Sequence, residues 1–60
     1  MTRYEIEQVA FALKDGGWNA EDEPLFRVEN QKQDPENIMA EDTISAVFAE
    51  MYRLESEKEV

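Results

Sequence analysis

The sequence predicts a small, mostly α-helical fold with two helices, at about residues 2–15 and 35–58, joined by an acidic connector. Two observations favour the helices: apolar side chains recur at helical spacing in both segments, and each segment begins with a capping signal. A third observation, the lack of helical periodicity between the two segments, favours a connector there. Because 60 residues make one small domain at most, we expect a single domain spanning 1–60.

The first helix has both a start and a stop signal. Thr2 and Glu5 have the spacing of a capping box, in which side chain and backbone satisfy each other's hydrogen bonds. One buried face is formed by Ile6, Val9, Ala10 and Leu13. A glycine pair follows, and with Gly17 as the first residue beyond the cap, Trp18 is expected to contact Leu13, as in a Schellman stop.

Two aromatic residues do not belong to that buried face. Tyr4 and Phe11 are seven positions apart and therefore lie within about 20° of each other, opposite Ile6 and Leu13. We expect the middle segment to fold over this aromatic pair. The alternative is that the pair forms a surface for a partner.

The connector is the hardest segment to interpret. Residues 21–24 read as a charged turn that ends in proline. In residues 25–29 the side chains partly alternate, with Phe26 and Val28 on one face, which allows a short strand in a β-hairpin with the chain around Trp18. A loop is the alternative, because a lone two-stranded hairpin is marginally stable.

The second helix has two candidate starting points. Asp34-Pro35-Glu36 combines an N-cap acceptor, a proline in the first turn and an early acid, which favours a helix running from 35 to about 58. A second start signal at 41–43 allows a break there. The tail, residues 55–60, is expected to fray.

The apolar stripe of the second helix predicts a homodimer. Its side chains cover roughly 160° of the helix surface, more than one short helix can bury. Small domains compensate for a small core with disulfides, metals or oligomerisation, and this chain has no cysteine. The predicted interface consists of Ile44, Val47, Phe48, Met51, Tyr52 and Leu54, within a seam that begins at Ala40.

The charge restricts the class of partner. Six basic and 15 acidic residues give a net charge of −9, and residues 15–42 alone carry nine acids against two cations. Such a chain is ill suited to direct contact with nucleic acid or an anionic membrane, because both require Lys and Arg. The charge therefore serves either recognition of a basic surface or solubility alone.

Catalysis and metal binding have little support in the sequence. Histidine and cysteine are absent, so the commonest general base and the strongest nucleophile are missing, and we predict no enzyme activity and no catalytic residue. The acids do not have the spacing of a calcium-binding loop, so we expect no metal and no cofactor. No apolar run reaches the length of a membrane span, and we expect a cytoplasmic protein.

Together these features predict a non-enzymatic acidic interaction module, such as an inhibitor or adaptor that presents carboxylates to a basic, nucleic-acid-binding protein surface. Small DNA-mimic proteins of phages and mobile elements act in this way, and the comparison rests on size and charge. The alternative is a scaffolding homodimer whose charge serves only solubility. The predicted partner-binding residues are Glu21, Asp22, Glu23, Asp34 and Glu36, with Trp18 and Phe26 as apolar anchors.

Overall fold

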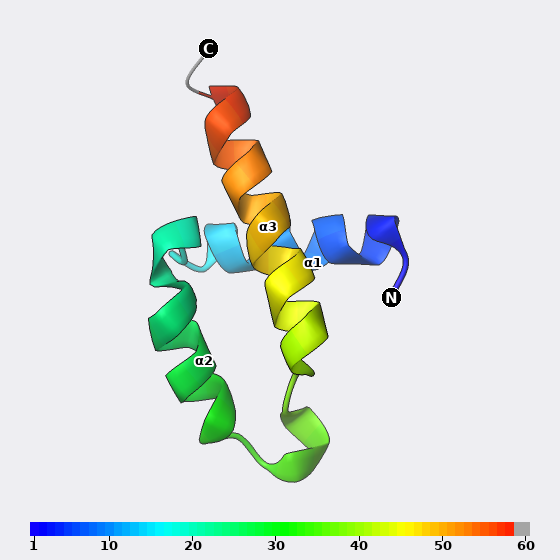
Figure 1. Cartoon of the computed structure of the whole chain (residues 1–60), viewed down its shortest axis with the longest axis vertical. Coiled ribbons are helices and arrows are strands. Elements are labelled where there is room, and N and C mark those ends of the chain that lie inside the picture. Colours follow the sequence, from blue (N-terminus) through cyan, green and yellow to red (C-terminus); the bar gives the residue numbers. More distant parts are fainter. Residues whose placement is uncertain (59–60) are drawn as a thin grey trace.

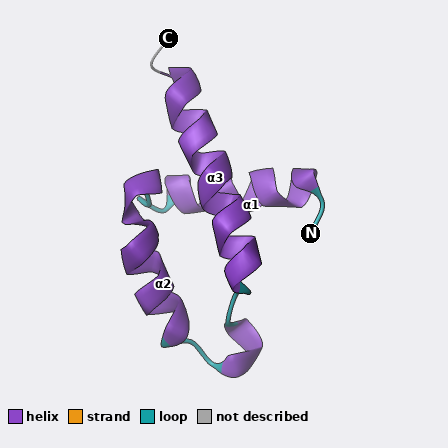
Figure 2. Ribbon diagram, viewed as in Figure 1, coloured by secondary structure: helices purple, strands orange, loops and turns teal. Residues whose placement is uncertain are grey.

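The computed structural model describes residues 1–58 and contains three α-helices and two single 3₁₀ turns (Figure 1). In chain order they are α1 (Arg3–Asp15), η1 (Ala20–Asp22), α2 (Glu23–Gln31), η2 (Pro35–Asn37) and α3 (Glu41–Lys58). Helix α1 crosses behind α3, and α2 descends beside the first half of α3. Figure 2 shows helices and loops but no strand among residues 1–58, which confirms the predicted mostly α-helical class.

Helix α1 begins and ends as its local signals predict. The Glu5 N–H donates to Thr2 Oγ1 and the Thr2 N–H donates to Glu5 Oε1, each over 3.1 Å, so the capping box is formed. At the other end, Gly17 has a φ of +99°. The N–H of Trp18 donates to the Leu13 carbonyl and that of Gly17 to the Lys14 carbonyl, which is the hydrogen-bond pattern of a Schellman stop.

Neither alternative for residues 25–29, a short strand or a loop, is correct, because these residues form the middle of α2. The helix begins with Pro24 in its first turn, where the missing N–H costs nothing. The Arg27 guanidinium donates to Glu23 Oε2 one turn earlier and to Ser45 Oγ on α3, each over 2.9 Å. A helix satisfies its backbone hydrogen bonds internally, whereas a hairpin here would have had a single partner strand.

Helix α3 begins at the second of its two start signals. Asp34-Pro35-Glu36 opens only the single turn η2, and Ile38 then adopts an extended conformation. The Met39 N–H donates to Asn30 Oδ1 and is therefore not part of a helical ladder. The prediction of one helix from residue 35 was thus wrong, and its alternative, a break before 41–43, is confirmed.

The core lies where α1 and η1 meet α3. Its fully buried side chains are Ala10, Ala20, Ile44, Val47, Phe48 and Met51, each at most 1% exposed. An aromatic stack closes one side: Trp18 meets Phe26 edge-on and Phe26 packs on Phe48, with 5.1 Å between ring centroids in both pairs. Most of the α3 stripe is therefore covered within one chain by α1, η1 and α2 together, while Ala40 and Tyr52 at its edges stay exposed.

Glu55 joins the end of α3 to the rest of the fold. Its Oε2 accepts from Lys14 Nζ over 2.9 Å and from the Ala20 N–H over 2.7 Å. The helix continues to Lys58, so residues 55–58 of the expected frayed tail are helical. Residues 59–60 lie outside the described part of the chain.

Candidate functional site

Within the described side chains, every Lys and Arg has an acidic partner. Four pairs are separate: Arg3–Glu7 at 3.4 Å, Lys14–Glu55 at 2.9 Å, Arg27–Glu23 at 2.9 Å and Lys32–Glu29 at 3.3 Å. Arg53 is the fifth cation and has several partners. The negative charge that no cation offsets is therefore carried by the remaining acids, and their positions decide where a basic partner is attracted.

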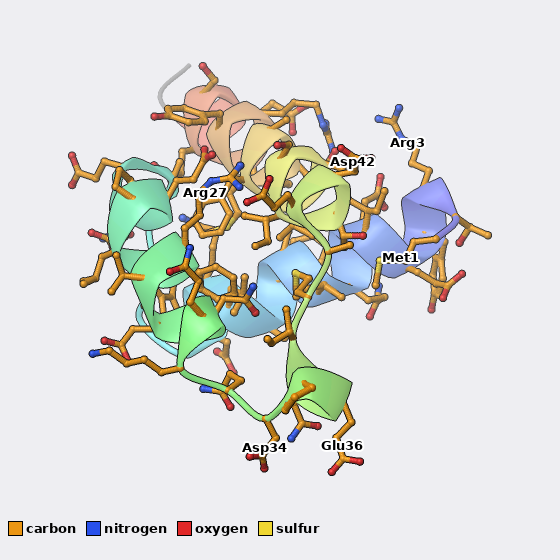
Figure 3. All side chains as sticks on the ribbon, turned by 60° about the horizontal axis from the view of Figure 1, so that its bottom comes forward. Met1, Arg3, Arg27, Asp34, Glu36 and Asp42 are labelled. Carbon is orange, nitrogen blue, oxygen red and sulfur yellow. The ribbon has the colours of Figure 1, made fainter. Side chains whose placement is uncertain are left out.

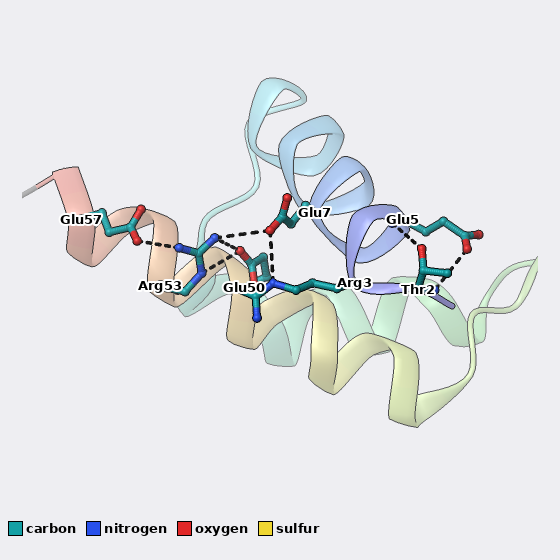
Figure 4. Close-up of polar contacts among 7 residues, drawn as sticks. All are labelled: Thr2, Arg3, Glu5, Glu7, Glu50, Arg53 and Glu57. Atoms are coloured by element: carbon teal, nitrogen blue, oxygen red, sulfur yellow. Dashed lines mark hydrogen bonds and ion pairs between the residues drawn. The ribbon is translucent and has the colours of Figure 1, made fainter.

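Arg53 is the centre of an ion-pair network between α1 and α3 (Figure 4). Its guanidinium contacts Glu50 and Glu57 on its own helix and Glu7 on α1, the last over 3.8 Å. Glu50 is only 9% exposed, and hydrogen bonding to Arg53 lowers the pKa of its carboxyl group and raises the pKa of the guanidinium. This network joins α1 to α3 and leaves Glu7 and Glu50 poorly available to a partner, whereas the Glu57 side chain is 61% exposed.

A second group of acids has no such compensation. We call it the acidic end; it consists of Asp34, Glu36, Glu41 and Asp42, all exposed. No Lys or Arg occurs between residues 33 and 52, and no ion pair within residues 1–58 involves any of the four. Figure 3 shows Asp34 and Glu36 at the tip of the connector, pointing away from the helices.

The connector that carries Asp34 and Glu36 is fixed at both of its ends. The Asn37 N–H donates to the Asp34 carbonyl over 2.8 Å and closes η2. The Asp34 carboxylate makes no capping hydrogen bond, so it remains open to solvent. Beyond the turn, the side-chain amide of Asn30 pairs with the backbone of Met39. The acids are therefore presented on an anchored loop.

The densest acidic run in the sequence is largely committed to structure. Asp22 Oδ2 accepts from the Asn19 N–H over 2.9 Å, and Glu23 is paired with Arg27. Of the three predicted contact acids in this run, only Glu21 is exposed. The structure therefore leaves these three acids less available than their density in the sequence suggests, and the gap in basic residues from 33 to 52 adds Glu41 and Asp42 to the acids without a described ion pair.

The predicted apolar anchors and interface residues lie mainly in the core. Trp18 and Phe26 are partly buried in the aromatic stack. Ile44, Val47, Phe48 and Met51 are buried within the chain and Leu54 packs against them, so Tyr52, 57% exposed, is the one predicted interface residue with an open side chain. Near the acidic end the exposed apolar side chain is Ile38, at 46%.

Tyr4 and Phe11 form a further exposed surface. They are 69% and 50% exposed, so the expectation that the middle segment covers them is wrong. Because α2 and η1 pack toward α3, they leave the opposite side of α1 open. We call this side the α1 outer face; its exposed residues are Met1, Tyr4, Gln8, Phe11 and Asp15.

Comparison with protein-family models, curated proteins and solved structures finds no match to this chain. The geometry described above is therefore the basis for assigning a function. None of the helices described over residues 1–58 is long and apolar enough to cross a membrane.

Proposed function

We propose that the protein is a non-enzymatic interaction module that binds a basic surface of another protein through its acidic end. One observation carries the proposal: described cations are all paired with other acids, whereas no described ion pair involves Asp34, Glu36, Glu41 or Asp42. Uncompensated charge on one part of a surface steers an oppositely charged partner to that part.

The carboxylates of the acidic end determine which side chains the partner must present. Carboxylates on an anchored loop accept hydrogen bonds from Arg and Lys, and planar guanidinium groups bind them in a bidentate fashion. Ile38 supplies a neighbouring apolar contact in place of the predicted Trp18 and Phe26. A protein that normally contacts nucleic-acid phosphates has such a surface, and its inhibition or recruitment is the proposed role.

The test compares two double variants with the same change in net charge. Asp34→Asn with Glu36→Gln removes two carboxylates of the acidic end and no side-chain hydrogen bond described within residues 1–58. Glu21→Gln with Glu29→Gln removes two carboxylates elsewhere, that of exposed Glu21 and that of half-buried Glu29, whose surface pair with Lys32 is worth only ~0–1 kcal/mol. Both variants should remain folded, as far-ultraviolet circular dichroism would verify.

Immobilised wild type and variants are used to capture protein from lysate at low and high salt, and the captured protein is then titrated against each. We expect the acidic-end variant to bind at least several-fold more weakly at low salt, the control to bind like wild type, and the difference to shrink at high salt. Equal affinity of both variants and wild type would leave the scaffolding homodimer, with charge serving solubility, as the better account.

A further inference from the structure

Two peptide bonds in this chain link an acidic residue to a proline, Glu23–Pro24 and Asp34–Pro35. The nitrogen of such a bond belongs to the proline ring and carries no N–H. As a tertiary amide it takes up a proton more readily than an ordinary peptide nitrogen, which makes it a better leaving group in acid. The side-chain carboxyl group is a nucleophile tethered close to the carbonyl carbon of the same residue. The surroundings of the two bonds therefore decide which of them reacts.

The carboxyl group of Asp34 is free to act as this nucleophile. Asp34 is exposed, makes no capping hydrogen bond and belongs to no ion pair described within residues 1–58 (Figure 3). Lys32, the nearest cation in the sequence, is paired with Glu29, and the other charged groups of this region are the carboxylates of the acidic end. With a ψ of 147°, Cβ of Asp34 stands out of the plane of the following peptide group, so a carboxyl oxygen reaches the carbonyl carbon from its face.

The carbonyl group of Asp34 is activated by the fold. The Asn37 N–H donates to its oxygen over 2.8 Å. A donor at this oxygen makes the carbonyl carbon more electrophilic and stabilises the negative charge that develops when a nucleophile adds. The donor belongs to the backbone of η2, and the Asn30–Met39 contact fixes the chain on both sides of it. The folded chain thus keeps the donor in place.

We propose that Asp34–Pro35 is a self-cleavage site, at which the Asp34 carboxyl group cuts the chain in mild acid. A carboxyl oxygen bonds to the carbonyl carbon of the same residue, and the bond from that carbon to the Pro35 nitrogen breaks. The electron pair stays on the nitrogen, which takes the proton that the carboxyl group gives up. A five-membered cyclic anhydride remains at Asp34, and one water molecule opens it to two carboxyl groups. The net reaction is hydrolysis of one peptide bond, and it opens the anchored loop of the acidic end.

The other acid–proline bond lacks these features. Glu23 Oε2 accepts from Nε and Nη2 of Arg27 over 3.1 and 2.9 Å, so its carboxylate is already engaged. Attack by a glutamate on its own carbonyl carbon also closes a six-membered ring, which forms more slowly than the five-membered ring of an aspartate. We therefore expect one cut, which gives fragments 1–34 and 35–60.

Intact-mass spectrometry of the full chain tests the site. Wild type is incubated at the lowest pH at which circular dichroism shows it folded, and the two fragments are followed over time. Asp34→Asn, which removes the nucleophile, should slow the cleavage at least tenfold, and Asp34→Glu should do the same because its ring is larger. Glu23→Gln is the matched control and should cleave like wild type. A wild type that stays whole or is cut mainly elsewhere, or an Asp34→Asn variant that is cut like wild type, would overturn the site.

A backbone variant tests the contribution of the fold. Asn37→Pro removes the N–H that donates to the Asp34 carbonyl and should slow cleavage several-fold, whereas Asn37→Ala keeps the N–H and should cleave like wild type. Wild type in concentrated urea at the same pH should also be cut several-fold more slowly. Equal rates for Asn37→Pro and wild type would refute activation by the fold. Cleavage is measured on the protein alone, so its failure leaves the proposed binding function untouched.

Discussion

The side-chain amide of Asn30 pairs with both backbone polar groups of Met39. Its Nδ2 donates to the Met39 carbonyl over 3.0 Å, and its Oδ1 accepts from the Met39 N–H over 2.9 Å. This contact joins the last turn of α2 to the segment that leads into α3. It therefore fixes both ends of the stretch of eight residues, 31–38, that carries Asp34 and Glu36.

Replacing Asn30 with alanine should loosen that stretch. Two partly buried hydrogen bonds are lost, and the Met39 backbone groups lose their partner, which predicts a loss of ~1–3 kcal/mol in the free energy of unfolding. Amide hydrogen exchange over residues 32–40 should accelerate more than over α1. Asn37→Ala is the control: that residue is exposed, and its side chain makes no hydrogen bond described within residues 1–58, so an equal effect there would refute the assignment.

The two glycines after α1 should respond oppositely to alanine. Gly17 has a φ of +99°, in the region that residues with a Cβ atom avoid, so Gly17→Ala should destabilise the fold by ~1–2 kcal/mol. Gly16 has a φ of −82°, and an added Cβ atom would lie at an ordinary 3.5 Å from its nearest neighbours. Gly16→Ala should therefore be neutral or stabilise by ~0.4–1 kcal/mol. Urea unfolding of both variants measures the contrast.

Adjacent residues of α3 should differ sharply in their contribution to stability. Met51 is fully buried, and Met51→Ala should cost ~2–5 kcal/mol, a large part of the stability of a small domain. Tyr52 is 57% exposed, and Tyr52→Ala should change stability by less than ~0.5 kcal/mol. Thermal unfolding checks both; a neutral Met51→Ala variant would mean that this core is wrongly described.

The Glu50–Arg53 contact should stabilise the fold at neutral pH and fail in acid. The pKa of Glu50 lies below its ordinary value of 4.5 in the folded chain, because Arg53 donates to its carboxylate. A lowered folded-state pKa contributes stability above about pH 4.5 that disappears as the pH falls through the folded value. A double-mutant cycle of Glu50→Gln and Arg53→Gln should show favourable coupling at pH 7 that weakens as the pH is lowered below about 4.5. Coupling of equal size at neutral and acidic pH would contradict this.

The parts of the fold that the sequence predicted correctly are those set by residues close together in the chain. The start of α1 at Thr2 and its stop at Gly17 depend on residues within one turn of each other, so both were predictable. The structure of residues 25–29 was not, because it depends on Phe26 reaching Phe48, more than 20 positions away. The sequence offered two local start signals for α3, and only the structure shows that the helix begins at the second.

The same distinction between local and long-range contacts applies to the candidate site. The pairing of Glu23 with Arg27 is a one-turn contact that the sequence contains, and it should have removed Glu23 from the predicted contact acids. The exposure of Tyr4 and Phe11 depends instead on where α2 packs, which only the assembled fold reveals. Likewise, the predicted α3 stripe is narrower in the structure, because Tyr52 is exposed, and its buried part is covered within the chain by α1, η1 and α2.

The crossing of α1 with α3 has a consequence for the order in which the chain can fold. Its core joins Ala10 to residues 44–51, so a loop of more than 30 residues must close before α1 packs on α3. Helices of 13 and nine residues are too short to be stable alone in water. A nascent chain that has left the ribosome only as far as residue 40 therefore lacks any stable structure. Folding begins when α3 emerges, and the chain then gains its helices and its core in one cooperative step.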